Sequence, residues 1–403
     1  MPANSGGGLA MRAGMMLQAF ATIGSVDLVV LPVCGSQNES SAYCEEFGIR
    51  PKVVPVDGRE KTHFTLVARV ANQAERLEAF KSFGEPSLAA YLSVPVLAEV
   101  AREVAGRSYD LVHISRSYLL PVLSIFDNAK PRPFVSVDLD EDDVLASERI
   151  AALFSLREQP HRAEWQVAEG LGYARLIRDW LPRVDLATIA TEVDRTSVAQ
   201  RFAIEPLLVP NAVDLQDRAL AADNAAHILF VGSFDHFPNV DAVLWLCEEI
   251  WPDFVRRSKA AMTIIGRAPP PRVRYLCDAR EIELLTSVTD LHPYYARASL
   301  ALVPIRAGAG SRYKLLEAAA HSVPVVATRL GAEGLEMADG RDLWLADDAY
   351  GFAEACADAI ADPRERLRRA EAARQCVKAK YNRTAVVRDL QHMLIDRMAT
   401  FGA

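Results

Sequence analysis

Residues 299–328, SLALVPIRAGAGSRYKLLEAAAHSVPVVAT, decide the fold predicted for this chain. They read as an apolar run, a loop of small residues, a helical stretch and a second apolar run, which is typical of a parallel α/β sheet. The first run, residues 300–304, is continuously apolar, so we expect a strand that is buried on both faces. The stretch therefore predicts a βαβ unit in a chain of the α/β class with a parallel sheet.

The loop before the helix has the character of an anion site. Gly308 and Gly310 leave so little bulk that backbone N–H groups can approach a ligand closely. Ser311 is a good N-cap residue, so we expect the helix to begin there with the positive end of its dipole towards the loop. Arg312 and Lys314 add cations where the dipole disfavours them, which a bound phosphate would explain. The alternative is an ordinary βαβ unit with surface charges.

One turn further, Glu317 is the only carboxylate of the run LLEAAA, where it can accept hydrogen bonds from a hydroxylated ligand. The segment resembles the C-terminal signature of retaining GT-B glycosyltransferases of the E-x7-E family, in the G-A-G-x-R-x-K-x-L-E subgroup found in exopolysaccharide clusters. The resemblance implies that Glu317 holds the nucleotide ribose. It implies that the donor diphosphate is held by Gly308, Gly310, Ser311, Arg312 and Lys314. The first Glu of E-x7-E falls at Ala309, which leaves the donor sugar open.

Length and composition set the broad class. A chain of 403 residues suits two domains, and 50% hydrophobic with 24% charged residues is typical of a globular protein. A net charge of −8 gives no electrostatic case for a nucleic-acid partner. The six cysteines show no metal-ligand spacing, so we expect reduced thiols and no metal. With no apolar run of membrane-spanning length and no signal peptide pattern, we expect a cytoplasmic protein, with peripheral membrane contact left open.

The N-terminus carries a second motif. Gly6, Gly7, Gly8 and Arg12 match the S-G-G-x-x-x-R element of the family, whose amides approach the donor phosphate or the acceptor. The alternative is a floppy terminus. In GT-B enzymes this loop follows the first strand, and here no strand precedes it. Because that strand is normally central, its absence should leave unpaired backbone groups in the core. We hypothesise that the true start lies upstream of Met1 or that the domain is rearranged.

The N-terminal half predicts further strands at residues 25–33 and 110–114 and helical periodicity at residues 87–105. The second strand resembles the D-V-V-H-x-H element of the family, with Ser115 at the position of the second His. His113 and Arg116 are therefore candidate cleft residues, while a satisfied structural His is the commoner alternative. The acidic run that follows residue 137 is interpreted as the N-cap of a helix rather than as a metal site.

The resemblance also divides the chain. Residues 210–214, PNAVD, resemble the hinge between the two GT-B domains. Gly232 belongs to an F-V-G-S loop at the start of the second domain, which lacks the Arg and Lys that ordinary family members carry there. We therefore expect Arg312 and Lys314 to supply that charge. The resemblance implies the GT-B fold, with two Rossmann-like, doubly wound α/β domains that face a cleft. The predicted parts are an acceptor-side domain (1–210), a donor domain (211–382) and a final helix that packs back on the first domain (383–403).

The implied function is transfer of a sugar, with retention, from a nucleotide sugar to a glycan, lipid-linked or small-molecule acceptor. No cofactor is expected, because the donor is itself a substrate. We expect catalysis to depend on Lys314 and Arg312, which stabilise the leaving phosphate, and on His113. One alternative is a nucleotide-sugar epimerase of the same fold. Another is a non-catalytic module that binds sugar nucleotides, which the residues Ala309 and Ser115 would suit.

Overall fold

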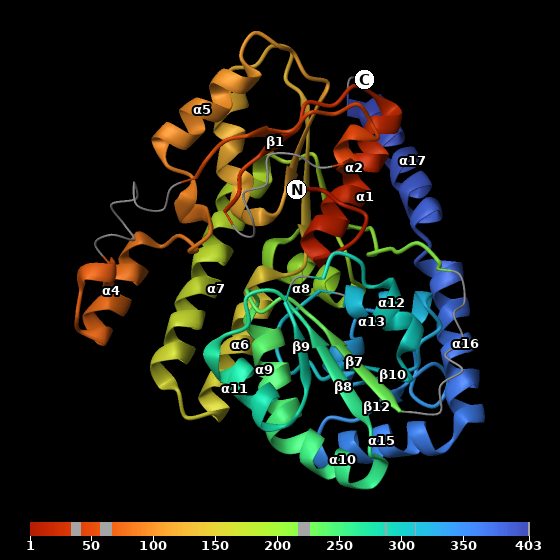
Figure 1. The fold of residues 1–403 in the computed structure, drawn as a ribbon. Helices are drawn as coiled ribbons and strands as arrows, with labels where there is room; N and C mark the ends of the chain where they lie inside the picture. Colours follow the sequence, from red (N-terminus) through yellow and green to blue (C-terminus); the bar gives the residue numbers. More distant parts are fainter. Residues whose placement is uncertain (34–41, 57–66, 217–225, 287, 311, 402–403) are drawn as a thin grey trace.

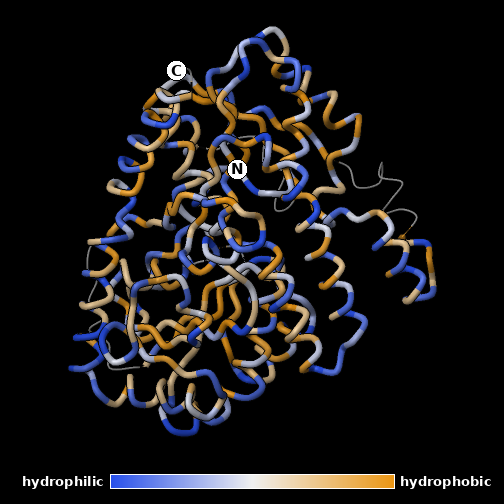
Figure 2. Tube along the Cα trace, turned by 180° about the vertical axis from the view of Figure 1, so that it is seen from behind, coloured by the Kyte–Doolittle hydropathy of each residue, from blue (hydrophilic) through white to orange (hydrophobic). Residues whose placement is uncertain are grey.

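The computed structural model describes residues 1–33, 42–56, 67–216, 226–286, 288–310 and 312–401. Two α/β parts lie one above the other in Figure 1, and each is built on parallel strands with helices packed around them. Hydrophobic residues gather along the interior strands, and hydrophilic residues dominate the outer helices (Figure 2). Among the described helices, none is both long enough and apolar enough to cross a membrane.

The C-terminal part contains a six-stranded parallel sheet in the order β12-β11-β10-β7-β8-β9. Its strands are β7 (His227–Val231), β8 (Ala261–Ile265), β9 (Glu283–Leu285), β10 (Leu300–Val303), β11 (Val325–Ala327) and β12 (Trp344–Leu345). The strand order reverses between β7 and β10, which is the switch point of a doubly wound sheet, where ligands commonly bind. All four residues of β10 are buried, as the continuous apolar run predicts.

Helices cover both faces of this sheet and complete the largest apolar core of the described chain. These helices are α9 (Phe237–Trp245), η5 (Leu246–Ile250), α10 (Trp251–Ser258), α11 (Pro271–Ala279), α12 (His292–Arg297), α13 (Tyr313–Ala320), α14 (Arg329–Ala332), α15 (Ala349–Ala361) and α16 (Pro363–Lys380). The following helix, α17 (Arg383–Phe401), leaves this part and packs against the first helix of the chain (Figure 1).

The N-terminal part has two separate parallel sheets. One has four strands in the order β3 (Leu111–Ser115), β4 (Phe134–Asp140), β5 (Leu186–Ile189) and β6 (Leu207–Leu208), and the other pairs β1 (Val29–Val30) with β2 (Lys52–Val53). Their helices are α1 (Gly8–Ile23), α2 (Ala42–Glu45), α4 (Gln73–Phe83), η2 (Ala89–Tyr91), α5 (Val94–Val104), η3 (Ser117–Phe126), α6 (Asp143–Leu156), α7 (Pro160–Trp180), η4 (Leu181–Arg183) and α8 (Glu192–Phe202).

Two sequence-based predictions for the N-terminal part are wrong in extent. The strand expected at 25–33 forms a ladder over only Val29–Val30, because it has a single described neighbour, β2. The helix expected over 87–105 is interrupted at Ser93, which is extended with ψ 162°, and it resumes with Pro95 in the first turn of α5. Proline favours the first turn of a helix and cannot continue one, so the break follows from the sequence.

The chain crosses between the two parts twice, and the two crossings are hydrogen-bonded to each other. The N–H of Val213 donates to the Tyr381 carbonyl at 3.0 Å, and the N–H of Arg383 donates to the Val213 carbonyl at 3.1 Å. The first crossing coincides with the predicted PNAVD hinge. Because each crossing supports the other, relative motion of the two parts must bend both segments together.

A buried ion pair fixes α1 to the sheet and to this hinge. The Arg12 side chain is only 1% exposed, and its Nε and Nη2 donate to the Asp138 carboxylate, both at 2.7 Å. Its Nη1 donates to the Val209 carbonyl at 2.9 Å and to the Asn211 Oδ1 at 2.8 Å. Arg12 thereby connects α1, β4 and the segment that leads into the second part.

We predict that Arg12→Met destabilises the fold by about 3–5 kcal/mol, because it leaves a buried carboxylate without its cation. Urea unfolding followed by circular dichroism measures this. The double variant Arg12→Met/Asp138→Leu should recover a large part of the loss, since it removes both charges. A single variant that costs under about 1 kcal/mol would contradict the structural role assigned to the pair.

Candidate functional site

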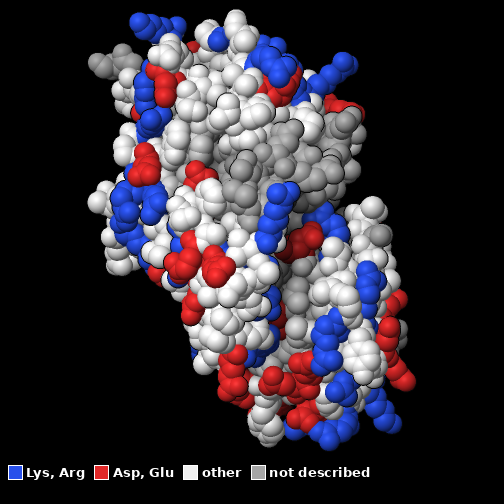
Figure 3. Space-filling view, turned by 90° about the vertical axis from the view of Figure 1, so that its left-hand side faces the viewer, with Lys and Arg blue, Asp and Glu red and all other residues white. Residues whose placement is uncertain are grey.

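A cavity of about 1890 Å³ lies between the two parts of the molecule and receives residues from both. The N-terminal part contributes Gly6, Gly7 and Gly8 together with the ends of β3 and β4. The C-terminal part contributes Gly232, the loop after β10 and the first turns of α13. On the flank shown in Figure 3, basic and acidic side chains alternate and form no continuous basic face. The cavity is therefore the place where the predicted site residues can meet.

The loop after β10 needs its glycines for conformational reasons. Gly308 and Gly310 have φ angles of 104° and 74°, which residues with a side chain rarely adopt. A Cβ on Gly310 would also lie 3.1 Å from the Glu141 Oε2 of the other domain. The N–H of Gly310 donates to the Asp194 Oδ2 at 3.1 Å, and Arg149 donates to the Gly308 carbonyl at 3.1 Å. The N-terminal part thus holds this loop by its backbone.

The helix after this loop begins later than the sequence predicts. Ser311, the expected N-cap, lies outside the described residues. In the structure, Arg312 occupies the N-cap position and α13 begins at Tyr313, so Lys314 lies in the first turn. Both cations therefore lie at the N-terminal end of the helix itself. The physical reason is that Arg312 remains extended, with φ −96° and ψ 102°.

Arg312 and Lys314 are half-buried cations, and neither forms an ion pair with a carboxylate of the described residues. Arg312 donates from Nη1 to the Ala309 carbonyl, while its Nε and Nη2 have no hydrogen-bond partner among the described residues. Lys314 Nζ donates to the Asn239 Oδ1 at 2.6 Å and lies 4.6 Å from the centre of the Phe230 ring. Burial, with the neighbouring Arg312, lowers the pKa of Lys314 to about 7. A bound anion would supply hydrogen-bond acceptors to Arg312 and would favour the charged form of Lys314.

Glu317 follows Lys314 on the same face of α13 and lines the same cavity. Burial raises its pKa to about 8, against the opposing effects of Lys314 and of a hydrogen bond from the Tyr295 side chain. Tyr295 is only 2% exposed, so this aromatic residue belongs to the core and orients Glu317 from behind. Glu317 is therefore mostly protonated at neutral pH in the ligand-free protein, and it can both donate and accept hydrogen bonds.

His236 is a cavity residue that the sequence analysis did not single out. It occupies the N-cap position of α9, in the loop that begins at Gly232. His236 is exposed at the edge of the cavity. Its enclosure by the surrounding chain and the nearby Arg312 and Lys314 lower its pKa, against the opposing effect of Glu141. The imidazole is therefore neutral at physiological pH. Its only sequence signal was the polar run Ser-Phe-Asp-His between a strand and a helix.

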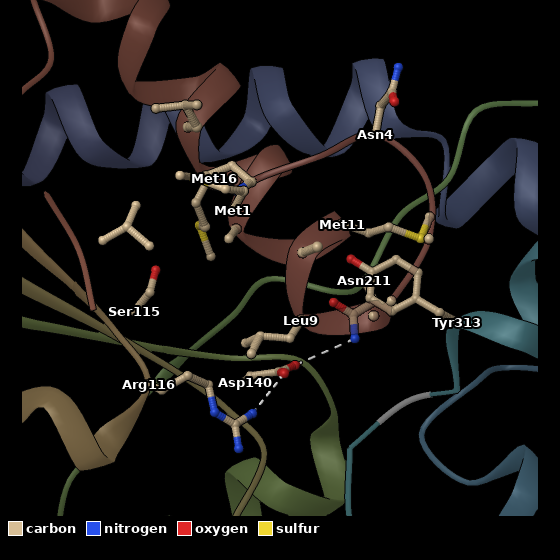
Figure 4. A pocket seen from close by; sticks show the side chains of 18 of the residues that line it. Met1, Asn4, Leu9, Met11, Met16, Ser115, Arg116, Asp140, Asn211 and Tyr313 are labelled. Carbon is tan, nitrogen blue, oxygen red and sulfur yellow. Dashed lines mark hydrogen bonds and ion pairs between the residues drawn. The ribbon is translucent and has the colours of Figure 1, made fainter. Parts of the chain in front are cut away.

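The N-terminal glycines and Arg12 lie in different surroundings. Gly8 packs on the ring of Tyr313, and a Cβ there would approach the Cδ2 of that ring to 3.0 Å. Figure 4 shows Met1, Met11, Asn211 and Tyr313 around this part of the cavity. Arg12 was predicted with the glycines as a contact to phosphate or acceptor, but it does not line the cavity. Its guanidinium is engaged by Asp138 and the hinge, so its role here is structural.

Arg116 and His113 lie at and near the carboxyl end of β3, as predicted, and both line the cavity. The Arg116 guanidinium contacts three carboxylates, Asp140 at 2.8 Å, Glu141 at 2.9 Å and Asp143 at 2.9 Å (Figure 4 shows the first). Its backbone has φ 91°, a strained angle of the kind that concentrates at functional sites. Because its charge is shared among these acids, Arg116 organises the acidic end of β4.

His113 hydrogen-bonds through Nδ1 to the Ser136 Oγ at 2.8 Å, and its Nε2 has no partner among the described residues. Burial lowers its pKa to about 4, so the ring is neutral.

The acidic run after residue 137 has two roles, since some of its carboxylates pair with Arg116 and another caps the next helix. Asp142 caps α6 by accepting from the N–H groups of Val144 and Leu145, as predicted. Among the described residues, no group of three His, Cys, Asp or Glu has the arrangement of a metal site.

Charged pairs join the two parts beside the cavity. Arg149 of α6 contacts the Glu333 carboxylate through two hydrogen bonds of 2.6 and 2.9 Å. Glu333 of the C-terminal part thus forms a bidentate pair with an arginine of the N-terminal part. Asp241 is 0% exposed at its side chain and is shared by Arg306, at 3.0 Å, and by Arg157 of the N-terminal part. These contacts hold the two walls of the cavity together.

Comparison with known proteins bears on the C-terminal part directly. Residues 225–362 match the family of glycosyl transferases group 1. A relative described as an uncharacterized 44.6 kDa protein in the cps region of Klebsiella pneumoniae is 28% identical over 137 residues. Those residues are 32% of this chain and 35% of the relative, so the match spans about a third of that protein. The matched glycosyltransferase segment contains Gly232, the loop after β10 and α13.

Solved structures extend the likeness to nearly the whole chain. Sucrose-phosphate synthase from Thermosynechococcus elongatus has a TM-score of 0.69 at 18% identity, covering 99% of this chain and 96% of that one. HepE from Anabaena, in complex with UDP and glucose, has a TM-score of 0.65 at 12% identity, covering 98% of each chain. At these identities the likeness concerns the fold. The prediction of a GT-B architecture with two Rossmann-like domains is confirmed.

The half-buried cations predict proton uptake when an anion binds. Below pH 7 Lys314 is already charged, whereas above pH 7 it must gain a proton to face the anion, so affinity should fall as pH rises. Calorimetric titration with inorganic pyrophosphate, in buffers of different ionisation enthalpy at pH 8, counts the protons taken up. We expect close to one more proton for the native protein than for Lys314→Met. Equal proton counts in the two proteins would contradict the buried, neutral amine.

Proposed function

We propose that this protein is a glycosyltransferase that moves a sugar from a nucleotide sugar to an acceptor with retention of configuration. The family match over residues 225–362 and the GT-B fold support transfer from an activated donor. The location of the cavity between the two domains supports a reaction in which one domain holds the donor and the other the acceptor. The sequence resemblance is what favours retention over inversion.

The observation that carries the proposal is the unsatisfied guanidinium of Arg312. Two of its buried nitrogen atoms lack partners among the described residues, which is costly unless a ligand supplies acceptors. A diphosphate supplies several acceptor oxygens and negative charge at once. Lys314 faces the same space from the first turn of α13. We therefore assign the donor diphosphate to Arg312, Lys314 and the backbone of the loop that contains Gly310.

Gly232 and Glu317 extend the donor site in two directions. A Cβ on Gly232 would lie 2.9 Å from the Asn239 Cγ and 2.9 Å from the Lys314 Nζ, so no side chain fits there. Because Gly232 has no side chain to block the Lys314 amine, a diphosphate can approach that amine. Glu317, held from behind by Tyr295, is assigned to the ribose hydroxyls, as the resemblance implies. The assignment of Ser311 to the same site stays a prediction, since it lies outside the described residues.

The chemistry requires stabilisation of a departing phosphate. Arg312 and Lys314, fixed and partly buried before reaction, can stabilise the negative charge that develops as the bond to the sugar breaks. We propose that the departing phosphate accepts the acceptor's proton, and that the reaction needs no metal or cofactor. His113 is neutral, and its free Nε2 is available for hydrogen bonding near the reacting centre. This is the catalytic role we propose for it.

The acceptor is assigned to the N-terminal wall. Gly6 and Gly7 leave open space, since nothing lies within 4 Å of a Cβ built on either residue. Ser115 and Arg116 line the same wall. The relative in the cps region of Klebsiella pneumoniae supports a saccharide or lipid-linked saccharide as acceptor, and thus a role in polysaccharide synthesis. Contact with a membrane surface, where such acceptors are held, belongs to the same proposal.

Two substitutions test the donor assignment. Glu317→Ala should weaken nucleotide-sugar binding by about 10-fold or more, because it removes hydrogen bonds to the ribose. Lys314→Ala should lower kcat by about 100-fold with a smaller effect on donor affinity. A panel of nucleotide sugars, screened by thermal shift, identifies the donor for these measurements. Glu336→Ala, at an exposed glutamate of the same domain, is the matched control. Unchanged kinetics in either site variant would contradict the assignment.

Incubation of the identified donor without acceptor separates the alternatives. An epimerase would convert the donor sugar into its isomer under these conditions, and a non-catalytic module would bind the donor but neither hydrolyse nor transfer it. A glycosyltransferase gives slow hydrolysis alone and a glycosylated product with an acceptor. Analysis of the anomeric configuration of that product by nuclear magnetic resonance then tests retention.

A further inference from the structure

The carboxylate of Glu141 faces the candidate site from the acceptor-side domain, and the proposed sugar transfer assigns it no role. Glu141 directly follows β4 and lines the cavity. Its Oε1 accepts a hydrogen bond from Arg116 Nη2 at 2.9 Å, whereas its Oε2 accepts none from the residues that the structure describes. One oxygen therefore fixes the side chain, and the other is available to a ligand in the cavity.

The local backbone turns Glu141 into the cavity. The register between β4 and β5 shifts between Asp138 and Asp140, and Asp140 has φ 64°. Aspartate tolerates this left-handed angle better than most residues, and such irregularities of a strand redirect the side chains next to them. The N–H of Glu141 then donates to the Leu139 carbonyl at 2.8 Å, which closes a γ-turn. The end of β4 thus has a specific local structure that presents this carboxylate.

Glu141 lies against the glycine loop of the facing domain. A Cβ built on Gly310 would lie 3.1 Å from the Glu141 Oε2 and 3.2 Å from the Glu141 Cβ. The same loop leads into Arg312 at the N-cap of α13. Of the carboxylates that raise the pKa of Arg312, Glu141 contributes most. The free oxygen of Glu141 is therefore close to the proposed diphosphate site, across the domain boundary.

The order of groups along α13 indicates which part of the donor reaches Glu141. In the proposed function, Glu317 holds the ribose, and Lys314 and Arg312, which precede it in the chain, hold the diphosphate. The sugar is attached to the outer phosphate, so it lies beyond Arg312, on the side away from Glu317. The next groups in that direction are the Gly310 loop and the carboxylate of Glu141.

We propose that Glu141 binds the donor sugar, with its Oε2 accepting a hydrogen bond from a sugar hydroxyl while Arg116 holds its Oε1. This inference rests on the proposed function and adds a specificity-determining residue to it. Hydroxyl groups donate strong hydrogen bonds to carboxylates, because the acceptor is charged. The diphosphate is then held by one domain and the sugar by the other, so the donor contacts both walls of the cavity.

The charges around Glu141 also select the kind of sugar. The network behind it contains two guanidinium groups, those of Arg12 and Arg116. Together they contact four carboxylates, which belong to Asp138, Asp140, Glu141 and Asp143. The network therefore has no cation to spare for an anionic sugar, and Glu141 itself repels one. The donor sugar is accordingly a neutral one with free hydroxyl groups rather than a uronic acid.

The test compares nucleotide sugars with their own nucleoside diphosphates. UDP-glucose, ADP-glucose, dTDP-glucose and GDP-mannose are titrated calorimetrically beside UDP, ADP, dTDP and GDP, and the base that binds most tightly is used thereafter. We expect Glu141→Ala to bind the nucleotide sugar about tenfold or more weakly, because a hydrogen bond to a charged acceptor is lost. Its affinity for the nucleoside diphosphate should stay the same or rise, since a negative charge near Arg312 is removed. Glu78→Ala, at an exposed glutamate of α4, is the matched control.

Deoxy-sugar donors separate sugar binding from a general effect on the site. Removal of the bonded hydroxyl should weaken binding to the native protein about as much as Glu141→Ala does, and the two changes together should add little. The uronic acid form of the donor should bind the native protein about tenfold or more weakly than the neutral sugar, and Glu141→Gln should reduce that difference. Because the deoxy series uses the native protein, it decides the proposal even if Glu141→Ala does not fold.

Equal weakening of the nucleotide sugar and of the nucleoside diphosphate in Glu141→Ala would overturn the proposal, because Glu141 would then only shape the phosphate site. Unchanged binding of every deoxy donor to the native protein would also overturn it. In both cases the native protein binds the donor, so the proposed function stands. If the native protein binds none of the nucleotide sugars, the proposed function is contradicted, and this inference with it.

Discussion

Partial burial of positive charge at the switch point of the C-terminal sheet is the constraint on which the rest of the structure depends. Arg312 and Lys314 lie at the dipole end of α13 that disfavours cations, and both are partly withdrawn from water. Among the carboxylates that offset Arg312, the two largest contributions come from Glu141 and Asp194 of the N-terminal domain, and a smaller one comes from Glu333 of the donor domain itself. The facing domain therefore supplies most of the negative charge that balances Arg312. An anion in the cavity would add to it.

This requirement explains why so many charged contacts cross between the domains around the cavity. Arg149 binds both Glu333 and the backbone of the glycine loop, and Asp194 accepts from that loop, so the facing domain shapes the anion site without occupying it. Arg12 and Arg116 act one layer deeper, where each neutralises carboxylates of β4. Without those two cations, the acids at the end of β4 would repel an entering phosphate far more strongly.

The sequence predicts those features whose causes are local. Glycines with positive φ, a buried apolar strand and two cations at a helix start can all be recognised within thirty residues, so the loop after β10 was located correctly. Arg12 was assigned to a ligand because a motif does not reveal its partner Asp138, which lies 126 residues away. His236 was missed for the same reason, because the cavity residues around it come from distant parts of the chain. The strand at 25–33 was overestimated because pairing, rather than propensity, determines its length.

The groups that face the donor space titrate close to neutrality, so the net charge of the site can change when an anion enters. The pKa values of Lys314 and Glu317 are about 7 and 8, each displaced towards neutrality mainly by burial. A diphosphate that enters such a site favours a proton on each of them. The site can therefore adjust its net charge by taking up protons, with little side-chain movement. When the phosphate departs from the sugar with additional negative charge, the same groups are already arranged to stabilise it.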